Sequence, residues 1–318
     1  NGNVIEGLST NSILASGVPG TVAGLFYALE NYGTWDIKPL VQPSIELAEK
    51  GFFLSSFQSK NLNRYKDKFI KNEDSKRIFT KPNGFKENDL LIQKDLARTL
   101  EKISANGIKE FYTGETSKKI INFFREEGGL LSKKDFENYK IRKLNPICGN
   151  YRSYKICSMP PPSSGGIALI QMLNILENVD LNKLKHNSIE YLNFLISAMN
   201  YAFHDRSIYL GDPAFFDIPV RKLTSKEYAK EIYEKIKQNI MPEDSSFLFN
   251  ESDETTHFSI IDKWGNIVSN TYTLNTAYGS GIIPKGTGIL MNNEMDDFSS
   301  KPGYPNTYGL IGSEANKI

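Results

Sequence analysis

The chain has 318 residues, 39% hydrophobic and 24% charged, a balance typical of globular proteins that bury one large core or two smaller ones. Its 38 basic and 37 acidic residues give a formal net charge of +1, which excludes the electrostatic signature of nucleic-acid or anionic-membrane binding and leaves a small molecule as the expected ligand. No apolar run approaches the roughly 20 residues that a membrane-spanning helix needs, so no span is predicted.

The first part of the chain is predicted to be helical. Between Gly20 and Tyr139 the apolar residues mostly recur at helical spacing, and the clearest stretches each end at a glycine: "VAGLFYALENYG", "VQPSIELAEKG" and "KDLARTLEKISANG". Further on, the pattern predicts one long helix from Asn187 to Pro213. Another helix is predicted in "TSKEYAKEIYEKIKQ", with Thr224 as its N-cap.

Strands are predicted later in the chain, at Cys148 to Met159, Thr256 to Asp262, Ile267 to Asn275 and around "GILMNNEM". Helices first and an antiparallel sheet later indicate an α+β layered fold, here expected as a single domain over residues 1–318.

The two cysteines, Cys148 and Cys157, are too few to form a zinc-site pattern with the three histidines, so no structural metal is expected. The segment "NPICGNYRSYKICSM" is predicted to be a hairpin whose turn at residues 152–153 sets the two cysteines opposite each other. Two interpretations stay open: a pair of reduced thiols, or a cross-strand disulfide if the protein is exported.

Two glycine-containing stretches resemble phosphate loops only superficially. "SGVPGTVAGL" lacks the lysine of a P-loop and is interpreted as a turn at a helix start. "PPPSSGGIAL" lacks a dinucleotide fingerprint, but its prolines, free hydroxyls and glycines at a helix N-terminus are compatible with a stiff, polar pocket lining.

A second hairpin follows an acidic run in "NESDETTHFSIIDKWGNIVSNTYTLNTAYGSG", with a turn at residues 262–266. If the connecting loop is 263–266, Thr256 faces Thr273 and Thr255 faces Leu274. A slip of one residue sets Thr255 opposite Thr273 or Asn275 instead. Every register therefore brings the Thr255 hydroxyl close to the polar "TLN".

A threonine hydroxyl becomes a good nucleophile only when a base takes its proton. His257 lies on the same strand face as Thr255, but a strand histidine is more often structural. If the peptide bond before Thr255 is cut, the new α-amino group, with a reference pKa of roughly 7.7 to 8.0, lies beside the hydroxyl of its own residue. Thr255 would then be both nucleophile and base, whereas strand packing alone would also explain a threonine there.

Several sequence motifs give more specific evidence than this physical reasoning. "ETTHFSIIDKWGNIVSNTYTLNTAYGSGIIPKGTGILMNNEMDDFSSKPGYPNTYGL", together with "ASGVPGTVAGL", "MPPPSSGG" and "DRSIYLGDPAF", closely resembles the gamma-glutamyltransferase (gamma-glutamyl transpeptidase or glutathione hydrolase) family of N-terminal nucleophile hydrolases. The resemblance spans essentially the whole chain, with the motifs in order.

The resemblance implies an inactive precursor, a zymogen that cleaves itself between Glu254 and Thr255. Residues 1–254 would be the large-subunit part, and residues 255–318 the start of the small-subunit part. It also implies a four-layer αββα sandwich and no cofactor. Thr255 would attack a γ-glutamyl amide such as glutathione and pass the γ-glutamyl group to water or to an amino-acid or dipeptide acceptor.

Five side chains match the family's site motifs. Thr273 matches a threonine whose hydroxyl contacts the nucleophile, and Asn275 a residue that helps to bind the glutamyl group. Glu294 and Asp297 match the positions that hold the substrate α-amino group, where two carboxylates suit an ammonium. Tyr308 matches the aromatic tip of a substrate-covering lid in bacterial relatives.

Other family motifs have no match in the chain. The arginine that pairs with the substrate α-carboxylate would precede Asn1, and the "PLSSM" serines and the paired oxyanion-hole glycines would follow Ile318. We therefore expect an internal fragment, truncated at both ends and close to inactive by itself.

Two alternatives are retained: a cephalosporin (glutaryl) acylase-like amidohydrolase, and a non-catalytic relative. The carboxylates Glu294 and Asp297 argue against the acylase, because a glutaryl group has no ammonium. The resemblance implies a periplasmic or secreted protein.

Overall fold

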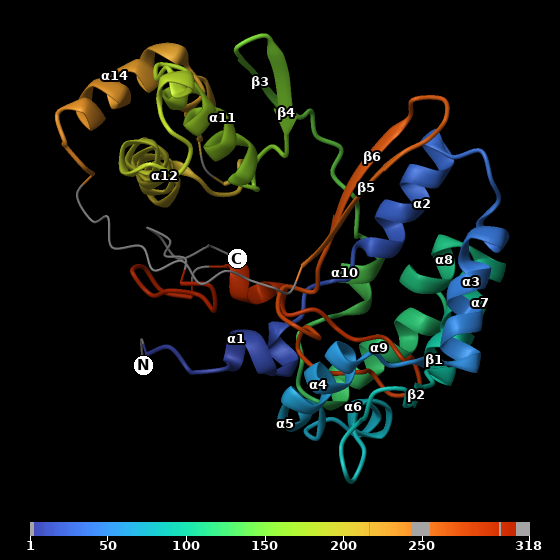
Figure 1. Ribbon diagram of the computed structural model, residues 1–318. Coiled ribbons are helices and arrows are strands. Elements are labelled where there is room, and N and C mark those ends of the chain that lie inside the picture. Colours follow the sequence, from blue (N-terminus) through green and yellow to red (C-terminus); the bar gives the residue numbers. More distant parts are fainter. Residues whose placement is uncertain (1–2, 216, 243–254, 299, 310–318) are drawn as a thin grey trace. The chain divides into compact units, whose positions relative to one another are not determined.

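The structure, a computed structural model, describes residues 3–215, 217–242, 255–298 and 300–309 (Figure 1). The chain divides into two compact units: unit 1 comprises Asn1–Ile141 and Glu251–Ser300, and unit 2 comprises Arg142–Asn250 and Lys301–Ile318. The expected single domain, with its division at residue 254, stays a prediction about the whole protein.

Unit 1 is mainly helical, as predicted. Its helices and 3-10 turns are α1 (Leu8–Asn11), η1 (Ile13–Ala15), α2 (Thr21–Tyr32), α3 (Ile37–Lys50), α4 (Ser56–Arg64), α5 (Lys66–Phe69), α6 (Glu73–Phe79), α7 (Lys94–Asn106), α8 (Ile108–Tyr112), α9 (Glu115–Glu126), α10 (Lys133–Glu137) and η3 (Glu294–Asp297). Its strands are β1 (Phe52–Phe53), β2 (Leu90–Leu91), β5 (Thr256–Ile261) and β6 (Ile267–Tyr272).

The predicted helix ends are confirmed for three helices. α2, α3 and α7 are followed by Gly33, Gly51 and Gly107. Gly51 has a φ of 83° and Gly107 a φ of 69°, a left-handed conformation that glycine adopts without a steric penalty.

Two hydrophobic clusters form the core of unit 1. One includes Phe124 and Met291, both fully buried, and the other includes Phe69 and Ile283, also fully buried. Ile283 and Met291 lie in the irregular segment that follows β6, so this segment is anchored in both clusters. The anchoring fixes the chain on which the predicted site residues are carried.

The strand predicted around "GILMNNEM" is wrong. Residues 288–293 have no regular secondary structure, although Met291 N–H donates to the carbonyl of Ile282 at 2.9 Å. Gly288 has a φ of 69°, and a Cβ there would lie 2.2 Å from the backbone nitrogen of Leu96. A left-handed residue pressed against α7 interrupts the regular strand geometry at this point.

The β5–β6 hairpin has the predicted turn, but its register is one residue away from the first one considered. Thr256 pairs with Tyr272, and Ile261 with Ile267. Oδ1 of Asp262 accepts from the backbone N–H groups of Trp264 (2.9 Å) and Asn266 (2.8 Å), so Asp262 belongs to the loop rather than to the strand. This Asx-type turn selects the slipped register.

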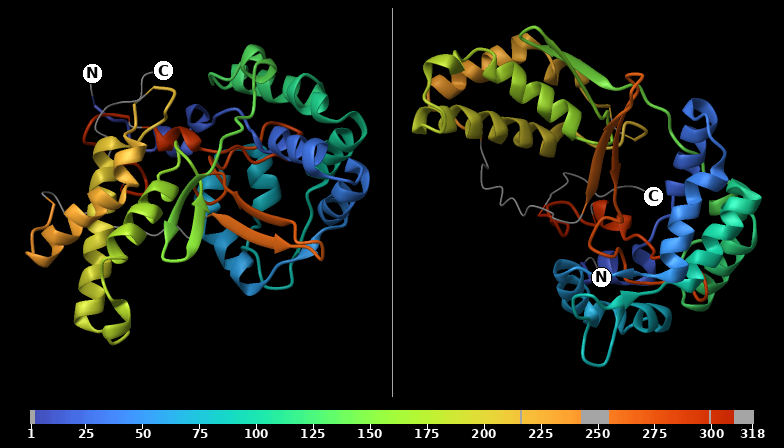
Figure 2. Two further views of the ribbon diagram at one scale, coloured as in Figure 1. Left: turned by 90° about the horizontal axis from the view of Figure 1, so that it is seen from above. Right: turned by 45° about the vertical axis from the view of Figure 1, so that its right-hand side comes forward.

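Unit 2 is built around α11 (Gly165–Leu176). α11 packs against α12 (Ile189–Tyr209), α14 (Lys226–Lys237) and the hairpin of β3 (Ile147–Tyr151) and β4 (Tyr154–Ser158), as Figures 1 and 2 show. The remaining elements are η2 (Leu181–Lys183) and α13 (Val220–Leu223). The predicted long helix is confirmed as α12.

The N-cap predicted for α14 is wrong by one residue. The Ser225 hydroxyl accepts from Tyr228 N–H at 3.2 Å, whereas the Thr224 hydroxyl donates to the carbonyl of Val220 at 2.8 Å and closes α13. Two adjacent hydroxyl residues both suit a cap, and the preceding short helix decides between them.

At the start of α11, the hydroxyls of the "PPPSSGG" motif are engaged within unit 2. Ser163 Oγ accepts from Gly165 N–H at 3.3 Å, and Ser164 Oγ accepts from Arg206 Nε–H at 3.1 Å. The motif therefore orders the start of the helix, and a pocket role for it stays a prediction.

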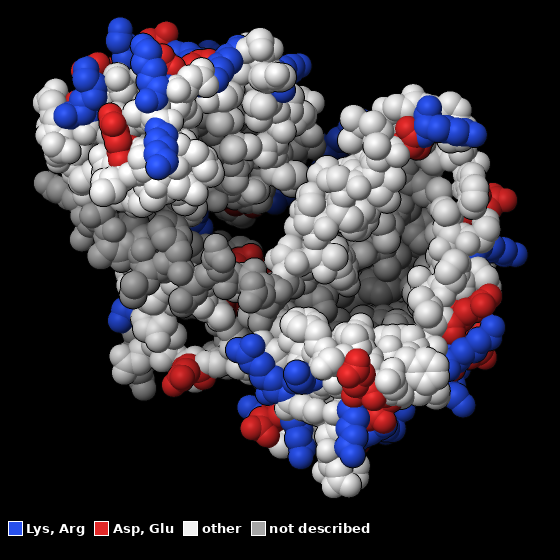
Figure 3. All heavy atoms as spheres, in the orientation of Figure 1, with Lys and Arg blue, Asp and Glu red and all other residues white. Residues whose placement is uncertain are grey.

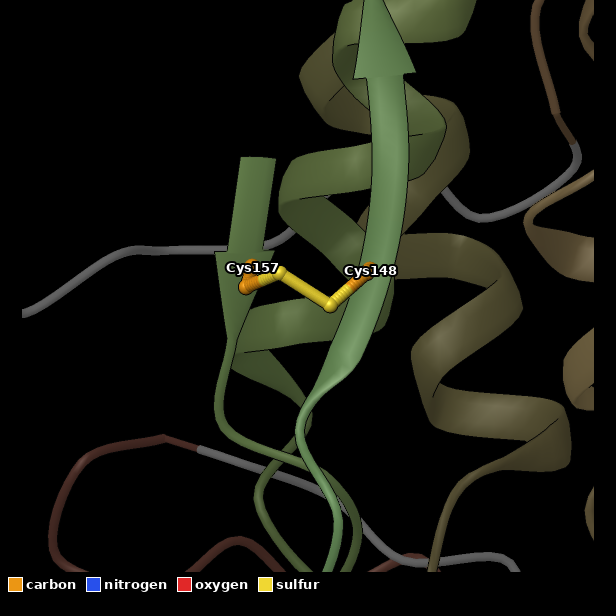
Figure 4. The surroundings of a disulfide bond; sticks show 2 residues. All are labelled: Cys148 and Cys157. Atoms are coloured by element: carbon orange, nitrogen blue, oxygen red, sulfur yellow. A yellow bond between two sulfur atoms is a disulfide. The ribbon is translucent and has the colours of Figure 1, made fainter. Parts of the chain in front are cut away.

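The β3–β4 hairpin has the predicted register, with Cys148 directly opposite Cys157. The two cysteines form a cross-strand disulfide (Figure 4). Of the two interpretations left open by the sequence, the structure shows the bonded one.

We expect the double change Cys148→Ser and Cys157→Ser to lower the free energy of unfolding of the full-length protein by about 2 kcal/mol, because the disulfide closes a short loop and so restricts the unfolded chain only modestly. Urea unfolding of the variant, and of the unchanged protein with and without reductant, measures this. Equal midpoints in all three samples would contradict it.

On the face drawn in Figure 3, basic side chains (blue) and acidic side chains (red) are interspersed. None of the helices in the described ranges combines the length and the apolar character needed to cross a membrane.

Candidate active site

Thr255 is exposed and directly precedes β5. Because Thr256 pairs with Tyr272, continuing the register by one residue sets Thr255 opposite Thr273. This is one of the registers expected from the sequence. Glu254, the other half of the predicted cleavage site, lies outside the described residues.

Thr273 and Asn275 are held together at the end of β6. Thr273 Oγ1 accepts from the backbone N–H of Asn275 at 3.0 Å and donates to its carbonyl oxygen at 3.4 Å. Asn275 is buried and has a φ of 76°, a conformation that asparagine tolerates better than most residues. The hydroxyl across from Thr255 is thus oriented by the backbone of the predicted glutamyl-binding asparagine.

Asn292 and Asn293 join this loop to the segment that carries the predicted carboxylates. Asn275 Nδ2 donates to the carbonyl of Asn293 at 3.0 Å, and Asn293 N–H donates to the carbonyl of Leu274 at 3.1 Å. Asn292 Oδ1 accepts from Glu294 N–H at 3.2 Å and from Gly17 N–H at 2.9 Å. Sequence reasoning missed both asparagines, although two amides after the apolar "GILM" are a signal for buried hydrogen-bonding groups.

The carboxylates lie on η3, a 3-10 turn in which residues three apart share one side. This spacing brings Glu294 and Asp297 together, and their side chains are hydrogen-bonded. Asp296, between them, is buried and accepts a 2.7 Å hydrogen bond from the Ser9 hydroxyl of α1. The structure therefore separates two clustered carboxyl groups from a third that is structural.

Burial, together with the negative charge and hydrogen bond of Asp297, raises the pKa of Glu294 to about 7. Two carboxyl groups this close share a proton near neutral pH when no cation lies between them. A bound ammonium would reverse the effect and favour the doubly ionised pair.

We expect the free energy of unfolding to fall as the pH rises from about 4.5 to about 7, since the folded state holds a proton on Glu294 that the unfolded state has released. Glu294→Gln should remove this part of the pH dependence and be relatively more stable at pH 8 than at pH 4. Urea unfolding of the full-length protein at both pH values measures it. An unchanged slope in the variant would contradict the assignment.

His257 is engaged with other hydroxyls of the hairpin. Its Nδ1 lies 2.9 Å from Thr271 Oγ1, and its Nε2 lies 3.3 Å from Ser259 Oγ and 3.2 Å from Ser269 Oγ. These contacts favour the structural interpretation over a Thr255–His257 catalytic pair.

Tyr308 lies in unit 2, where its backbone N–H donates to Asn306 Oδ1 at 3.0 Å. Its lid role stays a prediction. In the described ranges, no group of three or more His, Cys, Asp or Glu side chains is arranged to hold a metal ion. The structure thus brings together Thr273, Asn275, Glu294 and Asp297 in unit 1, with Thr255 aligned by the strand register.

Comparison with known proteins agrees with this arrangement. A family model described as Gamma-glutamyltranspeptidase matches residues 1–318. The glutathione hydrolase proenzyme of Escherichia coli (strain K12) is 46% identical over 324 residues, which cover 100% of the chain and 56% of that protein. The chain spans about half the length of the curated relatives it matches.

Two solved structures are similar to the chain, one in sequence and fold and the other in fold. The crystal structure of Helicobacter pylori gamma-glutamyltranspeptidase has 43% sequence identity and a TM-score of 0.72, with 74% of this chain and 68% of that chain covered. The cephalosporin acylase from Bacillus halodurans has a TM-score of 0.79 at 24% identity, covers 97% of this chain and 57% of that chain, and shows likeness of fold alone. The predicted mixed class of helix and strand is confirmed.

Proposed function

Because the chain belongs to the gamma-glutamyltranspeptidase family, we propose that the full-length protein is a self-processing threonine hydrolase and transferase for γ-glutamyl amides such as glutathione. One observation carries the proposal. Thr255, directly before β5, aligns with Thr273, and hydrogen bonds lead from Thr273 through Asn275 to the segment that bears the Glu294–Asp297 pair.

The first step is self-cleavage: the Thr255 hydroxyl attacks the carbonyl carbon of Glu254, and the peptide bond breaks to leave an ester on Oγ1. Water then hydrolyses this ester, which leaves a carboxyl group on Glu254 and a free α-amino group and hydroxyl on Thr255. This amine takes the proton of the Thr255 hydroxyl, and Oγ1 attacks the γ-carbonyl carbon of the donor. The carbon–nitrogen bond breaks, and the proton passes to the departing amine. Water or the amine of an amino acid or dipeptide then attacks the γ-glutamyl ester and regenerates the hydroxyl.

The Glu294–Asp297 pair is proposed to bind the donor's α-ammonium. Two carboxyl groups with a shared proton lose that proton when a cation lies between them, so donor binding and proton release are coupled. A glutaryl group lacks the ammonium and would leave the two carboxyl groups without a cation to bind. This argues against the acylase alternative.

The β5–β6 hairpin supports a four-layer αββα sandwich in the full-length protein. Within the described residues each sheet has two strands, and Phe258, Ile260 and Val268 on one face of this hairpin are exposed. Apolar side chains on a two-stranded ribbon favour further strands and a covering layer. We include Tyr308 in the proposal as part of a lid over the donor site.

Location outside the cytoplasm is also proposed, in the periplasm or the medium. The Cys148–Cys157 disulfide supports it, because such bonds persist in oxidising compartments. Fractionation of the native host with an antibody against the protein tests it, and a wholly cytoplasmic signal would overturn it.

The test of the function is expression of the full-length protein, followed by gel electrophoresis and an assay with a γ-glutamyl anilide. We expect two chains, with an amino-terminal threonine on the smaller one, and release of the aniline. An intact single chain without turnover would overturn the proposal in favour of a non-catalytic relative. Cleavage with faster turnover of a glutaryl than a γ-glutamyl anilide would favour the acylase.

A further inference from the structure

We infer that Asn293 is a positioning residue for donor binding, whose side chain sets the geometry between Asn275 and the Glu294–Asp297 pair. The inference rests on the proposed function and adds a residue to it. Asn293 is fully buried and lies directly before η3. It is therefore placed to act through its neighbours and not by contact with the donor.

Asn293 uses its side-chain amide to join three segments of unit 1. Its Oδ1 accepts from the backbone N–H of Thr276 at 3.1 Å. Its Nδ2 donates to Thr276 Oγ1 at 2.9 Å and to the carbonyl of Thr10 at 3.0 Å. The loop after β6, helix α1 and the start of η3 therefore meet at one amide.

The backbone of Asn293 completes the arrangement. Its carbonyl accepts from Asn275 Nδ2 at 3.0 Å and from the N–H of Asp296 at 3.2 Å. One carbonyl thus fixes both the side chain of Asn275 and the turn that carries the two carboxyl groups. A shift of this peptide would therefore displace both the Asn275 side chain and the turn that carries Glu294 and Asp297.

The loop held by Asn293 is also bound by Lys68 of α5. Nζ of Lys68 donates to the carbonyl of Gly279 at 2.8 Å and to Thr276 Oγ1 at 3.3 Å. Lys68 ties Thr276 and Gly279 to α5, and Asn293 ties Thr276 to the start of η3, so the Asn293 side chain sets how the loop meets η3.

The test is Asn293→Asp in the full-length protein, which keeps the size of the side chain and the acceptor for Thr276 N–H but cannot donate to the carbonyl of Thr10. We expect self-cleavage to be complete, kcat to change by less than threefold, and KM for a γ-glutamyl anilide to rise about tenfold, since buried hydrogen bonds are lost. The added carboxylate next to Glu294, Asp296 and Asp297 should also move the acidic limb of kcat/KM to higher pH.

Two variants of Thr276 keep the inference testable if Asn293→Asp folds poorly. Thr276→Val removes the hydroxyl that accepts from Asn293 Nδ2, together with its contacts to Lys68 Nζ and the Gly279 carbonyl, but keeps the Thr276 N–H bonded to Asn293 Oδ1. It should raise KM in the same direction by a smaller factor, whereas Thr276→Ser should restore it. Asn174→Asp is the matched control, since Asn174 is also buried and its Nδ2 donates to the carbonyl of Thr224 at 2.8 Å in unit 2. It should lower stability without changing KM or the pH profile.

Unchanged KM and pH profile in Asn293→Asp and Thr276→Val would overturn the inference. The same changes in Asn174→Asp would also overturn it, because they would then reflect general destabilisation. Absence of cleavage and turnover in the unchanged protein would instead overturn the proposed function.

Discussion

Thr255→Ala is expected to leave the full-length protein as one uncut chain with no measurable release of aniline from a γ-glutamyl anilide. The change removes the hydroxyl proposed to act in both self-cleavage and turnover, and loss of a catalytic nucleophile costs about four to six orders of magnitude in rate. Gel electrophoresis and the anilide assay, run on the same preparation, measure the two losses together.

Thr256→Ala is the matched control. Thr256 is the adjacent residue, is also exposed, and pairs with Tyr272 on the opposite face of the hairpin from Thr255. It should cleave normally and keep most of the activity. Equal losses in the two variants would show that the hairpin is being disrupted, and cleavage before residue 255 in Thr255→Ala would refute its role as nucleophile.

The parts of the fold that the sequence predicted are those set by local patterns. Helical periodicity followed by a glycine located the ends of α3 and α7. Alternation around a two-residue turn placed Cys148 opposite Cys157. In each case the residues that decide the geometry are close together in the chain.

The wrong predictions arose where a side-chain hydrogen bond or a contact with a distant residue sets the local backbone geometry. Asp262 continues the alternation of β5, but its carboxylate binds the turn and shifts the register by one residue. Gly288 begins the strand-like sequence "GILMNNEM", but its backbone is packed closely against α7. Neither contact can be read from hydrophobic periodicity.

The residues of the candidate site also differ in whether local sequence motifs or long-range contacts identify them. Motif resemblance indicated Thr273, Asn275, Glu294 and Asp297, whereas Asn293 became visible only through its contacts with Thr10 and Thr276, the first of them nearly the whole chain away. Hydrogen bonds between distant segments leave no periodic signal in one sequence. The residues proposed to bind the donor were therefore easier to predict than the residue proposed to position them.

The double change Glu294→Gln and Asp297→Asn is expected to reduce kcat/KM for a γ-glutamyl anilide by about two to four orders of magnitude, because each charge-assisted hydrogen bond to the donor ammonium contributes roughly 1.5 to 3 kcal/mol. Self-cleavage should proceed, since that reaction involves no donor ammonium. Steady-state kinetics with γ-glutamyl and glutaryl anilides measure the effect, and the preference for the γ-glutamyl compound should disappear.

Asp296→Asn provides the matched control for this pair. Asp296 belongs to the same turn, but it is buried and accepts from Ser9, and an asparagine oxygen can accept the same hydrogen bond. The control should keep both its activity and its preference for γ-glutamyl donors. If it loses that preference as fully as the double variant does, the turn as a whole sets specificity, and the paired carboxylates are not the ammonium site. If the double variant keeps the preference, the ammonium is bound elsewhere, and the pKa of Glu294 reflects only its burial beside Asp297.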